Sequence, residues 1–182
     1  MPHTPLPGPS LRFRLFGIPV WFHWSFPGVG LGIAVPSGIV ACFTASNLVL
    51  ELFAWCLAAV SALALVHEAG HAVVARLLSL EVHALQFAAG GACCIADEAT
   101  SAEHEVAYSA AGVVSQSVVL VATSLMLLGA LPSPEVGCGV AVFTAVNLLL
   151  ILANCWPSGG SDGHRIACAV NRLLAPCRQD AA

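Results

Sequence analysis

This chain of 182 residues is 58% hydrophobic and only 9% charged, whereas about a quarter of the residues in a soluble domain carry charge. Its length predicts one compact domain. The net charge of −4 includes only six basic residues, all of them arginine, and they form no basic patch of the kind that binds nucleic acid. The composition therefore excludes an ordinary soluble or nucleic-acid-binding protein and predicts one embedded in a lipid bilayer.

The N-terminal part, residues 1–24, is predicted to be a tail followed by an interfacial lead-in. The tail is rich in proline and polar residues up to Ser10. Leu11–Trp24 then mixes aromatic residues with two arginines and a Gly-Ile-Pro sequence that predicts a turn. We expect this segment to form an interfacial strand or an amphipathic lead-in, with Trp21 and Trp24 at the level of the lipid headgroups.

Four apolar stretches follow, each long enough to cross a bilayer as a helix, which takes roughly 20 residues. They are predicted at about Ser25–Ser46, Asn47–Ser79, Val106–Leu131 and Val136–Ala153. The fourth ends in a stretch rich in glycine and proline, Asn154–Gly163, and a short helix is expected to resume from about His164 to Leu174.

The segment between the second and third stretches, Leu80–Glu105, is too apolar for an ordinary loop and too short to span as a helix. Val82–Ala88 alternates weakly, as a strand does, and Gly90-Gly91 predicts a turn. Non-helical backbone is tolerated at membrane depth only where protein or a cavity covers it, so we expect a re-entrant strand packed against the helices. The predicted fold is an all-α polytopic membrane protein of about four transmembrane helices with a small membrane-associated β element.

Eight cysteines are spread along the chain. Four of them lie in apolar runs and are predicted to be buried as small hydrophobic side chains: Cys42, Cys56, Cys138 and Cys155. Cys93-Cys94 is the only adjacent pair and lacks the C-x-x-C spacing of a zinc ribbon or a redox motif, so we do not expect a metal site there.

The most informative motif lies in the second stretch, where residues 67–71 read HEAGH and match H-E-x-x-H. Apart from cysteine, its two histidines and its glutamate are the only ionisable residues between positions 52 and 75. Ionisable groups inside a membrane span are costly and mark functional sites. On a helix, His67 and His71 lie one turn apart on the same face and can bind one metal ion, while Glu68 is placed to act on a water at that metal.

A catalytic zinc site usually has three protein ligands and leaves one position for water, so a third ligand is expected. The chain offers Asp162, Glu51, His83, His104 and His164. Glu51 is excluded, because it lies about four turns before His67 on the same predicted helix. Asp162 lies where an apolar span is broken, a setting in which polar sites are built, but an aspartate among glycines also caps helices. The residues alone leave the choice open.

The pairing of HEAGH with a later N-x-x-P-x-x-x-x-D-G element, which begins at Asn154 and ends at Gly163, resembles the site-2 protease family of intramembrane zinc metalloproteases. The lead-in FRLFGIPVWFHWSF, the Gly90-Gly91 turn and Ala111-Gly112 are further similarities. Together they cover about residues 13–165. The chain departs from the family where proline, asparagine and glycine are usual, and the residues found there are Val113, Gln116 and His164.

The resemblance implies that Asp162 is the third ligand, beside His67 and His71, of a catalytic Zn²⁺. It implies that Glu68 is catalytic and that Asn154 lines the site, where it helps to hold the oxyanion or binds the substrate backbone. The expected activity is the hydrolysis of peptide bonds in transmembrane or membrane-tethered protein substrates, within or near the bilayer.

On this interpretation, residues 25–175 form the intramembrane metalloprotease domain and residues 176–182 a C-terminal tail. With four spans, all six arginines fall on one side of the membrane. The positive-inside rule then predicts a multi-pass protein of the cell membrane with both termini in the cytoplasm.

Two functions of other classes also fit a polar site inside a membrane: a metal transporter and a catalytically silent membrane scaffold. A transporter needs a path open to both faces and often contains an internal repeat, which the sequence does not show. The intact Glu68 argues against a silent protein.

Overall fold

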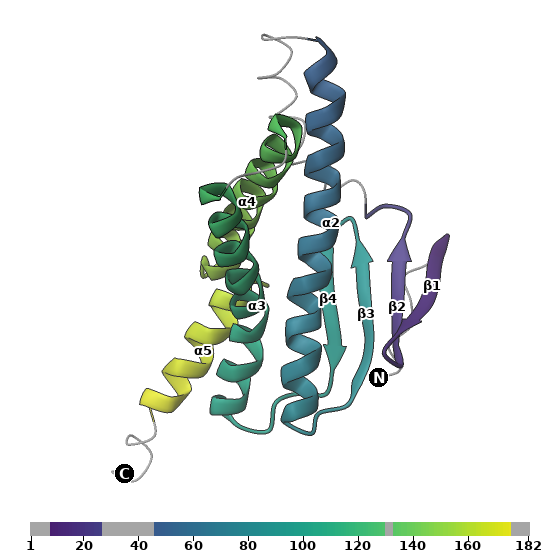
Figure 1. The fold of residues 1–182 in the computed structure, drawn as a ribbon. Coiled ribbons are helices and arrows are strands. Elements are labelled where there is room, and N and C mark those ends of the chain that lie inside the picture. Colours follow the sequence, from purple (N-terminus) through teal and green to yellow (C-terminus); the bar gives the residue numbers. More distant parts are fainter. Residues whose placement is uncertain (1–7, 27–45, 130–132, 176–182) are drawn as a thin grey trace, which may run out of the picture.

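The computed structural model describes residues 8–26, 46–129 and 133–175 of the chain. Its elements are, in order, β1 (Ser10–Leu15), β2 (Ile18–His23), α2 (Ser46–Leu77), β3 (Val82–Ala88), β4 (Gly91–Ala96), α3 (Ala102–Leu128), α4 (Pro134–Cys155) and α5 (Asp162–Leu174). Figure 1 shows α2, α3 and α4 as long helices packed together, with the strands arranged along α2 and with α5 near the lower end of α3.

Among the described residues, three helices are long and apolar enough to cross a membrane: residues Glu51–Leu77 of α2, all of α3 and all of α4. Only 17–33% of their most apolar windows is buried within the protein, so most of their surface would contact lipid in a bilayer. The second, third and fourth predicted spans are therefore present. The first predicted span, about Ser25–Ser46, falls almost entirely outside the described residues.

The described strands form one four-stranded sheet in the order β1-β2-β3-β4. β1 pairs antiparallel with β2, and β3 with β4, whereas β2 and β3 are parallel, with Val20 opposite Leu85. The strand predicted at Val82–Ala88 is confirmed. The predicted fold, mainly helical with a small β element, is confirmed in part. The β element is larger than expected, because the lead-in joins the same sheet through a pairing between segments far apart in the sequence, which leaves no local pattern.

The hairpin of β1 and β2 turns at Phe16 and Gly17, which both have positive φ angles of 48° and 83°. Two-residue turns with positive φ at both positions follow the twist of the strands, and glycine adopts that conformation without steric cost. The turn therefore includes only the glycine of the predicted Gly-Ile-Pro turn, while Ile18 and Pro19 already belong to β2. Trp24 remains 68% exposed at the end of the hairpin, as an interfacial residue would.

One face of the sheet packs against α2 through a cluster of buried apolar side chains. Its members are Ile18, Val20, Phe26, Ala72, Leu85 and Phe87. Phe22 stacks on Phe87 with ring centroids 4.2 Å apart, and Phe26 meets Phe87 edge-on at 5.4 Å; both geometries add to the free energy gained by burial. Because Ala72 directly follows His71, this packing holds the sheet beside the HEAGH segment.

A second apolar cluster joins α2 to α4, with Cys56, Ala59, Val60, Leu63 and Val146 as its buried members. The helices also approach closely at Gly139, where an added Cβ would lie 2.6 Å from the Trp55 ring. Small residues permit such close contacts between membrane helices. The prediction of buried cysteines is right for Cys56 and wrong for Cys138 and Cys155, which are exposed on α4, because an apolar run does not reveal which helix face a residue occupies.

The predicted break in the last span is present, since α4 ends at Cys155 and α5 begins at Asp162. Ser161 caps α5: its Oγ accepts a hydrogen bond from the backbone N–H of His164 at 3.2 Å. Such a cap satisfies a backbone donor at the helix start, and α5 therefore begins two residues earlier than predicted. Gly163 lies so close to the Cys155 carbonyl that a Cβ would overlap it, which places Asp162 near the end of α4.

Candidate metal centre

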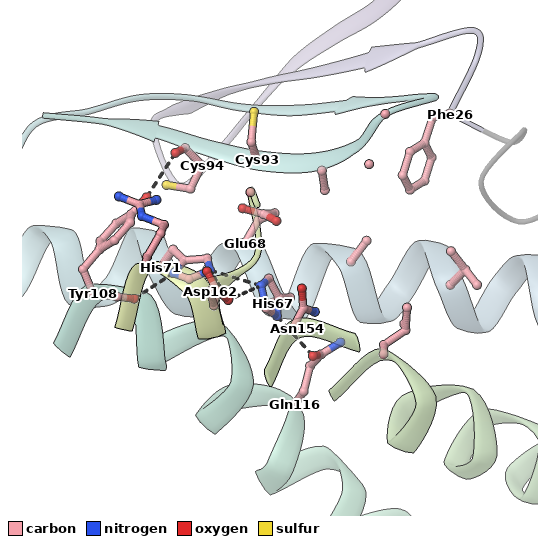
Figure 2. A pocket seen from close by; sticks show the side chains of 18 residues that line it. Phe26, His67, Glu68, His71, Cys93, Cys94, Tyr108, Gln116, Asn154 and Asp162 are labelled. Carbon is pink, nitrogen blue, oxygen red and sulfur yellow. Dashed lines mark hydrogen bonds and ion pairs between the residues drawn. The ribbon is translucent and has the colours of Figure 1, made fainter. Parts of the chain in front are cut away.

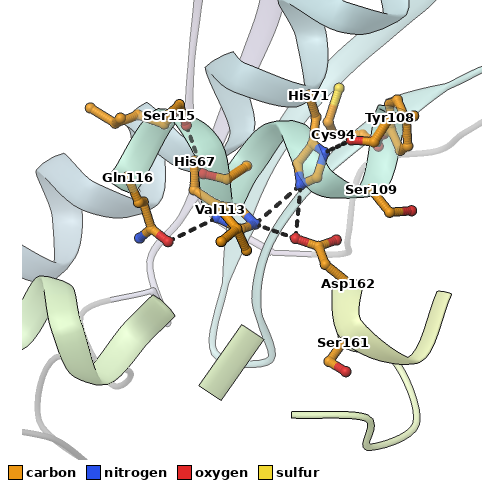
Figure 3. Close-up of polar contacts among 12 residues, drawn as sticks. His67, His71, Cys94, Tyr108, Ser109, Val113, Ser115, Gln116, Ser161 and Asp162 are labelled. Atoms are coloured by element: carbon orange, nitrogen blue, oxygen red, sulfur yellow. Dashed lines mark hydrogen bonds and ion pairs between the residues drawn. The ribbon is translucent and has the colours of Figure 1, made fainter. Parts of the chain in front are cut away.

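Two histidines of α2 and one aspartate of α5 converge in the interior of the protein (Figure 3). The Nε2 atoms of His67 and His71 are 3.1 Å apart. Oδ2 of Asp162 lies 3.0 Å from the first of them and 3.3 Å from the second. All three residues are buried. Within residues 8–26, 46–129 and 133–175, they are the one group of three or more His, Cys, Asp or Glu side chains arranged to hold a metal ion.

The outer nitrogen of each imidazole faces a hydrogen-bond acceptor. His71 Nδ1 lies 2.8 Å from the backbone carbonyl of Tyr108, and His67 Nδ1 lies 3.1 Å from Oε1 of Gln116. Carbonyl oxygens only accept, so Nδ1 carries the proton, and a neutral imidazole then has a lone pair at Nε2. Two nitrogen lone pairs therefore point toward the carboxylate of Asp162, an arrangement that a cation stabilises.

The carboxylate of Asp162 fits the same conclusion. Its Oδ2 is buried and has no hydrogen-bond donor among the described residues. A buried carboxylate oxygen without a partner costs free energy unless a proton or a cation satisfies it. Two imidazoles and one carboxylate are a donor set that binds a catalytic zinc ion and leaves a position open, so the residues present fit such a metal.

Gly112 of α3 lies directly against both imidazoles. A Cβ at this position would come within 2.5 Å of His67 Nε2 and 2.6 Å of His71 Nε2. Glycine therefore allows α3 to approach the site closely enough for Tyr108 and Gln116 to reach the rings. This steric requirement is a physical reason for the glycine that the sequence resemblance marked.

We expect Gly112→Ala to displace one or both imidazoles and to lower the affinity for zinc more than roughly 10-fold, because losing the orientation of a ligand costs about 10–100-fold. Competition with a chromophoric chelator measures that affinity. Gly129→Ala is the matched control, since its Cβ would meet the carbonyl oxygens of Met126 and Leu125 at ordinary distances of 3.6 Å and 3.8 Å. An unchanged affinity in Gly112→Ala would show that the rings tolerate the added methyl group.

Glu68 lines a cavity of about 300 Å³ that also reaches the His-His-Asp group. Its side chain is buried, and in Figure 2 it lies between α2 and β4, beside the two histidines. The polar lining comprises His67, Glu68, His71, Cys93, Cys94, Tyr108, Gln116, Asn154, Asp162 and Arg165, and the apolar lining includes Phe26, Val60, Ala64 and Leu150. A carboxylate and a candidate metal centre thus face one partly open cavity large enough for water and part of a peptide.

The structure brings together all five residues singled out as catalytic or metal-binding, and places the other candidate ligands elsewhere. Asn154, on the last turn of α4, lines the same cavity. Glu51 is exposed, ~24 Å along the axis of α2 from His67. His83 contacts the carboxylate of Asp97 at 3.0 Å outside the cavity lining. His104 and His164 also lie outside that lining.

Cys93 and Cys94 lie on β4 at the edge of the cavity. Burial raises the pKa of the Cys93 thiol, and it raises the pKa of the Cys94 thiol to about 12. The thiolate is the form of cysteine that binds metals and acts as a nucleophile. Both side chains therefore remain neutral thiols near neutral pH.

The residues that hold the histidines were not predicted from the sequence. Gln116 appeared only as a departure from the family, yet it is 1% exposed and accepts the hydrogen bond from His67. Its own backbone carbonyl accepts a 2.9 Å hydrogen bond from Nδ2 of Asn147, which is also fully buried. Amide side chains within apolar spans commonly join helices through hydrogen bonds. The presence of Gln116 and Asn147 in otherwise apolar stretches could therefore have indicated this contact. Tyr108 acts through its backbone, which no sequence pattern reveals.

No protein-family model and no curated protein matches the sequence. Among solved structures, the chain is similar to "Site-2 Protease from Methanocaldococcus jannaschii", with a TM-score of 0.60 and 19% sequence identity. The match covers 92% of this chain and 74% of that one. At this identity the likeness concerns the fold. The resemblance seen in the sequence is therefore confirmed at the level of the fold: the chain has a site-2 protease fold that carries a buried His67, His71 and Asp162 group.

Proposed function

We propose that this protein is an intramembrane zinc metalloprotease of the site-2 protease family, which hydrolyses peptide bonds of membrane-tethered proteins within or near the bilayer. The observation that carries the proposal is the position of Glu68. This buried carboxylate lies beside His67 and His71 and faces the same cavity as Asp162. A purely structural metal site needs no such acid beside a cavity, whereas peptide hydrolysis needs a general base there.

His67, His71 and Asp162 would hold Zn²⁺, which, when bound, supplies the Lewis acidity that activates water and polarises the peptide carbonyl. Glu68 takes a proton from the attacking water and delivers it to the leaving amide nitrogen. The hydrogen bonds that Tyr108 and Gln116 accept keep both imidazoles in the tautomer with Nε2 free for the metal.

Asn154 is proposed to bind the substrate. It lies on the last turn of α4 and lines the cavity opposite β4 (Figure 2). Its amide N–H groups can donate to the developing oxyanion or to a backbone carbonyl of the peptide, and either contact would help to hold the scissile bond near Glu68.

The edge of β4 is the proposed site at which the peptide backbone docks. β3 cannot take this role, because it is paired on both sides, with β2 and with β4. β4 ends the sheet beside the cavity, and its outer edge has no strand partner among the described residues. An extended peptide can add to such an edge. These hydrogen bonds would replace those that a substrate helix loses when it unwinds to expose a carbonyl.

The proposed protease domain comprises residues 25–175. Its strands β3 and β4 form one sheet with β1 and β2, which precede the domain in the sequence. Its proposed setting is a cell membrane, with both termini cytoplasmic. Arg76 donates a hydrogen bond to the Phe16 carbonyl at the end of α2, and Arg165 pairs with Glu105 at the start of α3. The end of α2 and the start of α3 both lie at the lower end of Figure 1, which supports one basic side.

The proposal is tested by incubating the purified protein with a transmembrane test substrate, with and without a zinc chelator. We expect cleavage without the chelator, loss of cleavage with it, and recovery when Zn²⁺ is added back, because the His-His-Asp group would then be refilled. A protein that binds zinc but cuts no membrane substrate, and that moves zinc across vesicles, would instead be a transporter.

The orientation is tested with reporter fusions. A reporter at the C-terminus should score as cytoplasmic, and one inserted in the predicted turn at residues 129–137 should score as external, because all six arginines come either before α3 or after α4 and none lies near this turn. An external C-terminus would contradict the four-span arrangement without bearing on the metal centre.

A further inference from the structure

α3 contributes none of the three candidate ligands, yet it supplies the hydrogen-bond acceptors that hold the two histidines in place. The Tyr108 carbonyl accepts the hydrogen bond from His71, and further along the helix the Gln116 side chain accepts the one from His67. The third ligand, Asp162, belongs to α5, and no hydrogen bond joins its side chain to α3. Its placement relative to the histidines therefore depends on how α5 is attached to α3.

That attachment centres on Arg165, one turn after Asp162 and so on the same side of α5. Its Nε donates to Oε1 of Glu105 at 2.8 Å, and its guanidinium lies 5.1 Å from the ring centroid of Tyr108. Glu105 is well placed to keep this partner, since its side chain is only 15% exposed and it also lies 3.5 Å from the Ser109 hydroxyl. A planar guanidinium suits both contacts at once, which a lysine would not.

α5 packs along α3, but it does so mainly with half-buried and exposed side chains. Of its 13 residues, only Asp162 and Ala169 are buried, so the helix buries little apolar surface. The segment that precedes it is exposed and includes Gly160 with a φ of 92°. The close contact of Gly163 with Cys155 anchors only the first turn. Beside the packing on α3, Arg165 supplies the side-chain hydrogen bond and the ring contact that join the two helices, and these directional contacts fix how α5 is oriented.

We propose that Arg165 is a positioning residue for the metal centre, which sets Asp162 against His71 through its contacts with Glu105 and Tyr108. Tyr108 connects the helix of Asp162 to His71, because its ring contacts Arg165 of α5 while its backbone carbonyl accepts the hydrogen bond from His71. Its hydroxyl also donates to the Cys94 carbonyl at 3.1 Å, which ties β4 to the same point. The inference rests on the proposed function for the identity of the metal, zinc.

The test measures zinc affinity by chelator competition, and the melting temperature of the zinc-free protein, in Arg165→Gln, Glu105→Gln and the double variant. Each single substitution should lower zinc affinity about 10-fold, in the range typical of residues that orient ligands. The double variant should lose about as much as either single one, because both remove the same contact. Arg165→Lys should lose less, and Arg172→Gln, an exposed arginine on the same helix, should lose nothing.

The zinc-free melting temperature separates positioning from folding. Positioning predicts weaker zinc binding with a melting temperature equal to that of Arg172→Gln, and a changed absorption spectrum of the Co²⁺-substituted protein. Unchanged affinity, independent losses that multiply in the double variant, or a lower melting temperature that accounts for the weaker binding would each overturn the inference. If the wild-type protein bound zinc and cleaved its substrate in those cases, the proposed function would stand; failure of the wild-type protein to bind zinc would refute both.

Discussion

Glu68→Gln should reduce peptide cleavage by roughly 100- to 10,000-fold, the usual contribution of a general acid–base group, while zinc stays bound. Glutamine has nearly the same shape as glutamate, so the packing around this buried position is preserved. The glutamine amide cannot take the proton from water. Glu68 is not one of the three residues that converge on the candidate metal centre. Activity should therefore fall without loss of metal.

The measurement pairs cleavage of a transmembrane substrate with the zinc content of the same sample. Glu51→Gln is the matched control, because it makes the same substitution on the same helix at an exposed position far from the cavity. Near-normal proteolysis by Glu68→Gln would remove the proposed mechanism and favour a transporter. Loss of zinc in that variant would instead assign Glu68 to the metal.

Asp162→Ala should lower zinc affinity by more than roughly 100-fold, and activity should fall with it. Residues that merely orient ligands contribute about 10–100-fold, and removal of a ligand should cost more. Two histidines with Nε2 atoms 3.1 Å apart would remain, which is one protein ligand fewer than a catalytic zinc site normally has.

Thermal melting of the zinc-free protein should change little in Asp162→Ala, because the residue lies in the first turn of α5 and not in an apolar cluster. His164→Ala and His83→Ala are the controls, since both are candidate ligands that lie outside the cavity lining. Full zinc occupancy in Asp162→Ala, together with loss in either histidine variant, would reassign the ligand set and weaken the relation to site-2 proteases.

The features of this protein that depend only on residues close together in the sequence could be predicted from the sequence. The three described spans follow from runs of apolar residues, because crossing a bilayer requires such a run whatever surrounds it. His67, Glu68 and His71 follow from spacing along one helix, since the helical repeat alone puts the two imidazoles on one face. The break before α5 follows from the glycines and the proline that end α4.

The third candidate ligand could not be assigned from local patterns in the sequence. From the residues alone, Asp162 was one choice among several, and only the family resemblance selected it. In the structure it lies 3.0 Å from His67 while the other candidates lie outside the cavity lining. That distance results from how α5 packs on α3, and no pattern within α5 encodes it.

The sheet and the supports of the histidines were decided by tertiary structure for the same reason. β2 pairs with β3 although the whole of α2 separates them in the sequence. This pairing leaves β4, and not β3 (Val82–Ala88), as the edge strand beside the cavity. Tyr108 holds His71 through a backbone carbonyl, a group that every residue has. The sequence by itself thus determined the membrane spans and the two histidines with their glutamate, because one helix suffices to define them. Only the packing of α3, α5 and the sheet against α2 decided the third candidate ligand, the hydrogen-bonding of the imidazoles and the free strand edge, because each depends on distances between segments far apart in the chain.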